Sequence, residues 1–280
     1  MNHLSHAVVR EAVVRALGED CGPCDITTQA VIDPSTKASA QVVAKQDGVF
    51  AGITVAQAVF HEADPTLAFT PLKADGDSFE KGAILAQVDG LARGILTGER
   101  VALNFMQRLS GIATLTAAYV RAVAHTRCHI LDTRKTTPGL RALEKYAVRC
   151  GGGRNHRMGL YDEFMIKDNH IALGGGDLEQ LIRRARAFDA KARLTVEAER
   201  LDQVERLIDL GVDRILLDNM SVQDMAQAVR MAGGRIETEA SGNMTLERVP
   251  CVAETGVDFI SVGALTHSAP AIDLSLQLRT

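Results

Sequence analysis

The second half of the chain alternates short apolar runs with helix-like segments. Between successive runs lies a segment with the 3.6-residue period of an amphipathic helix, and no hairpin turn joins two runs. Strands that alternate with helices pair in parallel through crossover connections. The pattern therefore predicts an α/β architecture, either a β/α barrel or an open sheet. The six strand-like runs are residues 128–133, 163–169, 193–199, 214–219, 235–242 and 258–264.

Polar residues follow the apolar part of each predicted strand. In a β/α barrel the carboxyl ends of the strands converge on one mouth, where catalytic groups gather. A charge inside a strand would be buried at a cost of several kcal/mol, so charges are expected at strand ends. This placement favours the barrel. The residues concerned are Asp132, Arg134, Lys135, Lys167, Asp168, Glu197, Glu199, Asp218, Asn219, Glu239, Ser241, Asn243 and Gly263.

Cations are concentrated around the first two of these strands. The stretch from Leu131 to Ile171 holds eight Lys and Arg against five Asp and Glu, whereas the whole chain has 31 against 35 and a formal net charge of −4. The residues outside this stretch therefore carry 23 Lys and Arg against 30 Asp and Glu. A basic island in an acidic protein predicts a ligand with more than one negative charge, held by several cations at once.

The predicted mouth divides by chemistry. The basic cluster suits carboxylates, and the acids Glu197 and Asp218 suit ribose hydroxyls or a magnesium ion. Glycine-containing turns after the last two strands, at residues 241–243 and 262–264, can present backbone N–H groups to a phosphate. Together these features predict a site for a phosphorylated sugar beside a polycarboxylate.

The first hundred residues follow another pattern. Strand-like runs at 38–45, 48–52 and 74–90 surround a helical period at 53–64, which predicts an α+β sandwich. Residues 99–125 are expected to form a long helix, with Glu99 near its start where the helix dipole favours an acid.

Composition narrows the classes of protein. The mild acidity argues against a general nucleic-acid binder. The sequence contains no run of about 18 apolar residues, so no membrane span is expected. Five cysteines without framework spacing suggest reduced thiols. The N-terminus lacks a signal-peptide pattern and is expected to form an amphipathic helix, so we expect a cytoplasmic protein.

One block of motifs resembles a known family. The segments ERVALNFMQRLSGIAT, DTRKTTPGLRALEKYAVRCGGGRNHRMGLYDEFMIKDNHI, VEAE, ILLDNM, EASGN and ISVGALTHSAPAIDLSL, in this order, resemble quinolinate phosphoribosyltransferase. The resemblance runs from about Asp25 to Leu278. It implies an open-faced α+β sandwich over residues 1–109, an incomplete β/α barrel over 110–267, and a C-terminal segment, 268–280, that packs back on the first domain.

The resemblance also implies a reaction and a set of site residues. The family converts quinolinate and phosphoribosyl diphosphate to nicotinate mononucleotide, diphosphate and carbon dioxide with magnesium, in de novo NAD biosynthesis. Its members are homodimers, and a hexamer is compatible. By motif, Lys135, Lys167, Glu197 and Asp218 would be catalytic, Glu197 and Asp218 would hold the ribose and its Mg²⁺, directly or indirectly, and Arg100 would reach into the partner's site. The other residues implied to bind substrate are Thr133, Arg134, His156, Arg157, Ser241, Gly242, Asn243, Val262, Gly263 and Ala264.

Several alternatives stay open. Lys167 could form a Schiff base in a class I aldolase, or the barrel could take a different base. Glu197 and Asp218 could cap the helices that follow them. The three glycines at 151–153 could be a flexible connector. The family's acidic, glycine-rich start is here Asp20-Cys21-Gly22-Pro23-Cys24-Asp25-Ile26-Thr27, so Cys21 and Cys24 are incidental cysteines in a turn, a labile disulfide or part of a metal or redox module.

Overall fold

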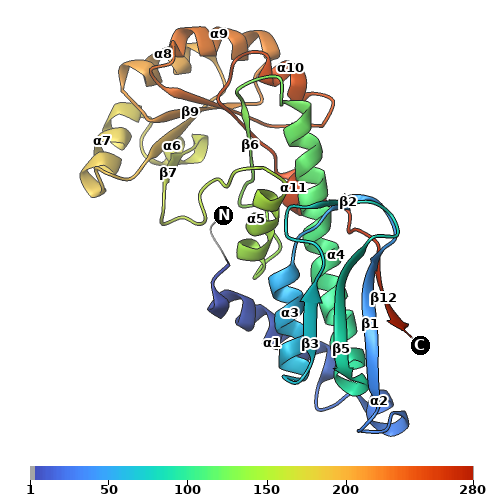
Figure 1. Cartoon of the computed structure of the whole chain (residues 1–280). Helices are drawn as coiled ribbons and strands as arrows, with labels where there is room; N and C mark the ends of the chain where they lie inside the picture. The colour runs from blue at the N-terminus through green and yellow to red at the C-terminus, as the bar shows by residue number, and fades with distance from the viewer. Residues whose placement is uncertain (1–3, 280) are drawn as a thin grey trace. The chain divides into compact units, whose positions relative to one another are not determined.

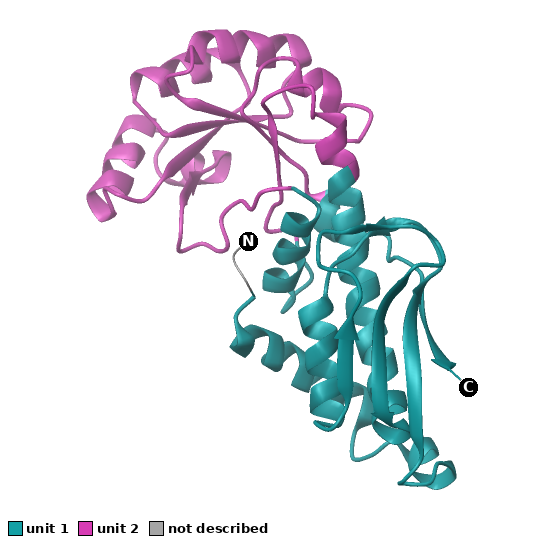
Figure 2. Cartoon of the chain, viewed as in Figure 1, with its two compact units in different colours: residues 1–117, 136–152, 264–280 teal, residues 118–135, 153–263 magenta. Residues whose placement is uncertain are grey.

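The computed structural model describes residues 4–279, which form two compact units (Figure 2). Unit 1 comprises the described residues up to Ala117, residues 136–152, and the described residues from Ala264 onward. Unit 2 comprises residues 118–135 and 153–263. Neither unit is continuous in the sequence, so a single cut near residue 109 does not separate them, and the predicted domain boundaries stay a prediction.

Unit 2 is built on a six-stranded sheet in the order β6–β11–β10–β9–β8–β7 (Figure 1). Every recorded pairing in it is parallel. Each strand falls in one of the six predicted runs, so the predicted parallel α/β architecture is confirmed. The strands are β6 His129–Leu131, β7 Phe164–Ile166, β8 Leu194–Ala198, β9 Arg214–Asp218, β10 Glu237–Ser241 and β11 Phe259–Ser261.

The two faces of this sheet differ in polarity because successive side chains point to opposite sides. Val196, Ile215, Leu217, Ala240 and Ile260 share one face, and each has 0% of its surface exposed. Helices α8, α9 and α10 contact strands of the sheet and supply the apolar cover. The helices of unit 2 are α6 Asp168–Leu173, α7 Leu178–Phe188, α8 Leu201–Asp209, α9 Val222–Ala232 and α10 Val249–Ala253.

The opposite face of the sheet is polar. Thr195, Glu197, Arg214, Glu237 and Glu239 alternate with the apolar residues along β8, β9 and β10. Strands β6 and β7 are the two ends of the sheet order, and no pairing joins them within the described residues. The sheet is therefore an incomplete barrel, as predicted, and its polar inner face was not predicted.

Unit 1 contains a four-stranded antiparallel sheet in the order β12–β1–β5–β3. The last strand of the chain pairs with β1 from Ser39↔Arg279 to Ala44↔Leu274, so the C-terminal segment belongs to the N-terminal sheet. Strands β2 and β4 form a separate pair. The elements are α1 His6–Cys21, α2 Ile26–Val31, β1 Lys37–Ala44, β2 Gly48–Val49, α3 Ile53–Ala63, β3 Ala68–Pro71, β4 Ser78–Phe79, β5 Ile84–Leu91, α4 Ala92–Ala122, α5 Arg141–Cys150, α11 Ala264–His267 and β12 Leu274–Arg279.

The start of the long helix differs from the prediction. Helix α4 begins at Ala92, so Glu99 lies about two turns inside it and the expected dipole interaction at the helix start is wrong. Glycines disfavour a helix interior, which hid the true beginning. Here they allow close packing: a Cβ at Gly94 would lie 2.5 Å from Cβ of Asp64, and one at Gly98 would lie 3.0 Å from the ring of Phe60. Among the described helices, none is long and apolar enough to cross a membrane.

Candidate active site

The carboxyl ends of β6 to β11 define one edge of the sheet, here called the carboxyl edge. Lys167 follows β7 directly, Glu197 is in β8, and Asp218 and Ser241 end β9 and β10 (Figure 1). The register places Asp218 directly opposite Ser241. Because the strands are parallel, unit 2 gathers most of the predicted site residues at this edge. The exceptions, Arg100 on α4 and Ala264 on α11, belong to unit 1.

Lys167 and Glu197 form an ion pair across the neighbouring strands β7 and β8. The Nζ atom of Lys167 bonds directly to Oε2 of Glu197. The Glu197 side chain is only 8% exposed, whereas that of Lys167 is 41% exposed. The buried carboxylate of Glu197 thus holds the amine of Lys167, whose side chain remains partly exposed.

The acids do not cap the following helices. Ser221 caps α9 through its side chain, and Arg200 is the N-cap residue of α8. Asp218 is half-buried, and its Oδ2 accepts a hydrogen bond from Nδ2 of Asn219 at 2.9 Å. The capping alternative for Glu197 and Asp218 is therefore wrong.

Arg134 and Arg157 bring two positive charges together. Burial lowers the pKa of the Arg157 guanidinium, and the nearby charge of Arg134 lowers that pKa further. Nη1 of Arg157 is fixed by donation to the carbonyl oxygen of Glu163 at 3.0 Å. The two guanidinium groups repel each other, and an anion with two carboxylates bound between them would offset this repulsion.

The loop after β6 is exposed at the predicted basic positions. Arg134 and Lys135 are exposed, and Thr133 is half-buried. The Lys135 N–H donates to Oγ1 of Thr133 at 3.0 Å, which fixes the local turn. The preceding residue, Asp132, has 0% of its surface exposed.

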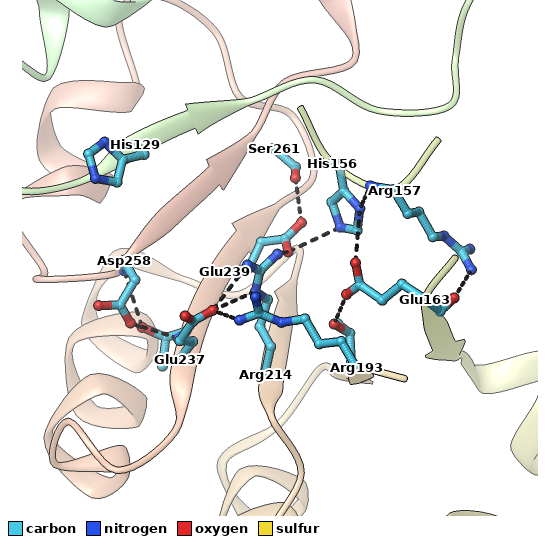
Figure 3. Close-up of polar contacts among 12 residues, drawn as sticks. His129, His156, Arg157, Glu163, Arg193, Arg214, Glu237, Glu239, Asp258 and Ser261 are labelled. Atoms are coloured by element: carbon cyan, nitrogen blue, oxygen red, sulfur yellow. Dashed lines mark hydrogen bonds and ion pairs between the residues drawn. The ribbon is translucent and has the colours of Figure 1, made fainter. Parts of the chain in front are cut away.

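His156 directly precedes Arg157 in the loop before β7, and its ring points toward Glu239 and Glu163 (Figure 3). Its side chain is 5% exposed, and its Nε2 lies 3.3 Å from Oε2 of Glu239. Its backbone N–H donates to Oδ1 of Asp132 at 2.8 Å. The ring is therefore engaged by protein groups, and its contribution to a ligand would be made through Arg157.

The turns after β9, β10 and β11 are tightly built. Asn219 donates its N–H to the Ser241 carbonyl at 3.0 Å, and a Cβ at Gly242, where φ is +91°, would lie 2.1 Å from Oδ1 of Asn219. Asn243 is exposed and also has a positive φ, 51°. Only glycine fits at position 242. In the next turn, the Val262 N–H donates to the Leu131 carbonyl at 2.9 Å and is committed to the sheet, and half-buried Gly263 follows.

A buried polar network on the inner face of the sheet was missed by the sequence analysis. Glu239 is 0% exposed in the middle of β10, although charges were expected only at strand ends. It contacts Arg214, Ser261 and His156. Arg214 also bonds to Glu237, and its Cζ lies 4.1 Å from the ring centroid of Phe259. The alternation of Glu237, Glu239 and Ser241 with Thr238 and Ala240 was the available signal for a polar inner face.

Two of the three consecutive glycines are packed, and the first of them has no room for a side chain. Gly151 and Gly153 are buried. A Cβ at Gly151 would lie 2.3 Å from the Ala113 carbonyl oxygen and 2.7 Å from Cβ of Thr116. The glycine therefore lets α5 end against α4, and the interpretation of a flexible connector is wrong.

The cysteines give no sign of a redox or metal module. All five are free, and Cys21 and Cys24 are each partly exposed around the end of α1. Within the described residues, no group of three or more His, Cys, Asp or Glu side chains is arranged to hold a metal. Asp25 instead caps α2, accepting from the N–H of Thr28 at 3.0 Å.

A cavity of about 820 Å³ lies at the other edge of the same sheet, among residues that precede β8, β9 and β10. Its lining includes Arg186 and Arg193, which pair with Asp213 and Glu237 respectively. The lining also contains the cations Lys191 and Arg235.

Comparison with known proteins assigns the fold to one family. A model described as the quinolinate phosphoribosyl transferase C-terminal domain matches residues 112–277, and the corresponding N-terminal domain model matches residues 25–110. The chain is 43% identical to the probable nicotinate-nucleotide pyrophosphorylase [carboxylating] of Bacillus subtilis, covering 99% of this chain and 95% of that protein. It is 46% identical to the chloroplastic nicotinate-nucleotide pyrophosphorylase [carboxylating] of rice, covering 95% of this chain and 76% of that protein.

Solved structures agree with the sequence comparison. The crystal structure of NadC from Streptococcus pyogenes is similar with a TM-score of 0.96 and 42% identity, covering 100% of this chain and 99% of that one. The nicotinate-nucleotide pyrophosphorylase of Francisella tularensis is similar with a TM-score of 0.94 and 38% identity, covering 99% of this chain and 98% of that one. Both family models and the curated relative describe a phosphoribosyl transferase or pyrophosphorylase, which argues against the aldolase alternative.

Proposed function

The chain belongs to the quinolinate phosphoribosyltransferase family, and from that premise we propose how its own residues carry out the family's reaction. The protein is a decarboxylating phosphoribosyltransferase of de novo NAD biosynthesis. It converts quinolinate and phosphoribosyl diphosphate to nicotinate mononucleotide, diphosphate and carbon dioxide. The observation that carries the assignment of roles is the carboxyl edge, where cations that follow β6 and β7 lie on the same edge as acids of β8 and β9.

Quinolinate is held by the basic part of this edge. Its two carboxylates lie on adjacent ring carbons, so a dianion leaving water needs several fixed cations. Arg134, Arg157 and Lys167 supply these charges, and Lys135 and Thr133 flank the same loop. The proximity of Arg134 to Arg157 supports this role, because each guanidinium gains most when a dianion lies between them.

The glycosyl transfer takes place between this cluster and the two acids. The pyridine nitrogen attacks the anomeric carbon, a carbon–nitrogen bond forms, and the bond to the diphosphate oxygen breaks with its electron pair leaving on diphosphate. Positive charge grows on the sugar, so the carboxylates of Glu197 and Asp218 stabilise the transition state. Glu197 is pre-positioned for this by its pairing with Lys167.

Magnesium fits the acids as a companion of the substrate. Mg²⁺ commonly binds one or two protein carboxylates, keeps several waters and uses substrate phosphates as further ligands. Glu197 and Asp218 provide two carboxylates, and the described residues offer no larger cage. The ion would be held by these acids, directly or through water, and would neutralise charge on the departing diphosphate.

The late turns bind the sugar phosphate. Ser241, Gly242 and Asn243 follow β10, and Gly263 and Ala264 follow β11 just after Val262. The absence of a side chain at position 242 lets backbone approach a phosphate closely. This assignment is supported by the position of both turns at the carboxyl edge.

Decarboxylation follows without another cofactor. Once the ring nitrogen is quaternised, the bond from the neighbouring ring carbon to its carboxylate breaks, carbon dioxide leaves, and the electron pair stays on the ring carbon, which takes up a proton. Lys135 and Lys167 serve here by holding the carboxylates in place. The same cations that select quinolinate therefore orient the bond that breaks.

The assembly is a homodimer in which Arg100 of one subunit completes the site of the other, and such dimers can assemble further into a hexamer. Arg100 is exposed on α4, as a residue offered to a partner must be. Mixing Arg100→Ala subunits with Lys167→Ala subunits tests this: hybrids should regain activity that neither parent shows, and an inactive mixture of exchanged subunits would contradict shared sites. The five free thiols support a cytoplasmic location.

The reaction itself is tested by incubation with quinolinate labelled in the carboxylate at ring carbon 2, phosphoribosyl diphosphate and Mg²⁺. We expect nicotinate mononucleotide and labelled carbon dioxide in equal amounts. Nicotinate in place of quinolinate is the control and should release no carbon dioxide. Failure of the wild-type protein to form the nucleotide would overturn the assigned function.

A further inference from the structure

Glu239 is a buried acid to which the reaction as described gives no role. Its Oε1 accepts from the hydroxyl of Ser261, and its Oε2 lies 2.9 Å from Nη1 of Arg214 and 3.3 Å from Nε2 of His156 (Figure 3). We propose that Glu239 is a positioning residue for the quinolinate side of the site: it fixes the His156 ring and, through that ring, the backbone that carries Arg157. This inference rests on the function proposed above.

The hydrogen bonds of His156 define its tautomer. The backbone N–H of Arg157 donates to Nδ1 of His156 at 2.6 Å. Since a backbone N–H can only donate, Nδ1 must present a lone pair, and the proton of the neutral ring is therefore on Nε2. Nε2 lies 3.3 Å from Oε2 of Glu239, an ion-pair distance, whereas Nδ1 lies 3.9 Å from Oε2 of Glu163. The nearer carboxylate, that of Glu239, therefore favours the tautomer in which Nδ1 accepts from the Arg157 backbone.

The segment around Arg157 is held on two sides. Asp132 accepts from the His156 N–H at 2.8 Å and from Nδ2 of Asn155 at 2.5 Å. Beyond it, Nη1 of Arg157 donates to the Glu163 carbonyl, and the Glu163 carboxylate accepts from Oγ1 of Thr195 at 2.6 Å. Asp132 and Glu239 therefore fix residues 155–157 from β6 and β10. A shift of about 1 Å in such a segment is enough to cost about 100-fold in catalysis.

Glu239 is suited to this task because it is held in its charged form. Burial alone raises the pKa of Glu239, but its interactions with His156, Arg214 and Ser261 together outweigh burial, so its pKa lies below its usual value. Arg214 is itself anchored by Glu237 at 3.0 Å. The acceptor for the His156 proton is thus fixed in place and ionised at neutral pH.

The test compares two acids on one strand. Glu239→Gln keeps the shape but removes the charge, and we expect KM and Kd for quinolinate to rise at least about 10-fold, with KM for phosphoribosyl diphosphate unchanged within about twofold. Glu237→Gln is the matched control, because Glu237 lies two residues earlier, shares Arg214, and makes no recorded contact with His156. It should leave both substrate constants within about twofold of wild type.

Two further measurements separate positioning from simple stability. In a His156→Ala background, Glu239→Gln should add less than about twofold to KM for quinolinate, because its effect passes through the ring. Nitrogen-15 NMR of the wild-type imidazole, which does not depend on the variant folding, should show the proton of His156 on Nε2. The inference is overturned by a proton on Nδ1, by equal effects of the two glutamine variants, by equal weakening of both substrates, or by full additivity. The Kd for quinolinate and the His156 tautomer need no turnover, so they can fail even when the wild-type protein forms nicotinate mononucleotide, and formation of that nucleotide tests the proposed function alone.

Discussion

Replacement of Lys167 distinguishes a substrate-binding lysine from one that only neutralises Glu197. The Lys167 side chain is 41% exposed, and it pairs with the Glu197 side chain, which is 8% exposed. If the amine also binds a quinolinate carboxylate in the transition state, Lys167→Gln removes one preorganised donor. Such a loss costs about 2–4 kcal/mol, or about 30- to 900-fold in kcat/KM. Because the change also leaves the largely buried Glu197 carboxylate without its partner, a loss of folding stability of up to about 3–5 kcal/mol is expected beside the kinetic effect.

The double variant makes this prediction specific. If Lys167 served only to balance Glu197, the combined change Lys167→Gln and Glu197→Gln would restore most of the activity, since no uncompensated charge would remain. We expect instead that the double variant is as inactive as Lys167→Gln or more so. Lys191→Gln is the control, because Lys191 is an exposed lysine of the same unit outside the carboxyl edge, and it should stay within about twofold of wild type.

The assay is the release of carbon dioxide from labelled quinolinate at saturating phosphoribosyl diphosphate, with urea unfolding measured in parallel. A loss in kcat/KM of less than about threefold for Lys167→Gln, or recovery of activity in the double variant, would refute the reasoning.

Three further predictions follow from packing, burial and charge. Gly151→Ala places a Cβ 2.3 Å from the Ala113 carbonyl oxygen and should destabilise the fold by at least about 1–3 kcal/mol in urea unfolding. The control is Gly18→Ala, in helix α1 with no atom within 4 Å of the added Cβ, which should be neutral or stabilising by up to about 1 kcal/mol. Equal unfolding midpoints for the two variants would contradict this prediction. Burial raises the pKa of Cys128 and of Cys150 to about 12. A thiol reagent at pH 8 should therefore label the exposed Cys251 first, and Cys128 and Cys150 only on unfolding, as read by peptide mass mapping. For the two partly exposed cysteines at the end of α1, replacement of Cys21 and Cys24 by Ser should leave catalysis intact. Since the folded pKa of Glu239 lies below its ordinary 4.5, its ionised form stabilises the fold above pH 4.5, and this contribution is lost as pH falls through the folded pKa. The stability difference between wild type and Glu239→Gln should therefore shrink as pH falls below about 4.5, and a constant difference would argue against a charged Glu239.

The fold of unit 2 was predictable because the strand pattern and the helix pattern in its sequence agree. Apolar runs of strand length alternate with amphipathic helices, and both periods follow from side-chain geometry alone. The start of α4 was not predictable in this way. Gly94 and Gly98 look unfavourable in a helix until Asp64 and Phe60, at least 30 residues earlier in the chain, are known to pack against them. Close approach between distant segments leaves no local trace in a sequence.

The site was predictable at strand ends and unpredictable within strands. Lys167 and Asp218 could be assigned to the carboxyl edge because parallel strands end together. Glu239 could not be given a role, because its partners Arg214, Ser261 and His156 come from other strands and a loop. The cost of burying a charge was a sound argument against a lone acid in a strand. It failed here because three partners offset that cost.

The most direct test of the account is a crystal structure of the protein soaked with quinolinate. We predict that the ligand binds at the carboxyl edge of the six-stranded sheet, with its two carboxylates within hydrogen-bonding distance of Arg134, Arg157 and Lys167. Quinolinate bound instead in the cavity at the opposite edge, among Arg186, Arg193 and Arg235, with the carboxyl edge empty, would contradict it.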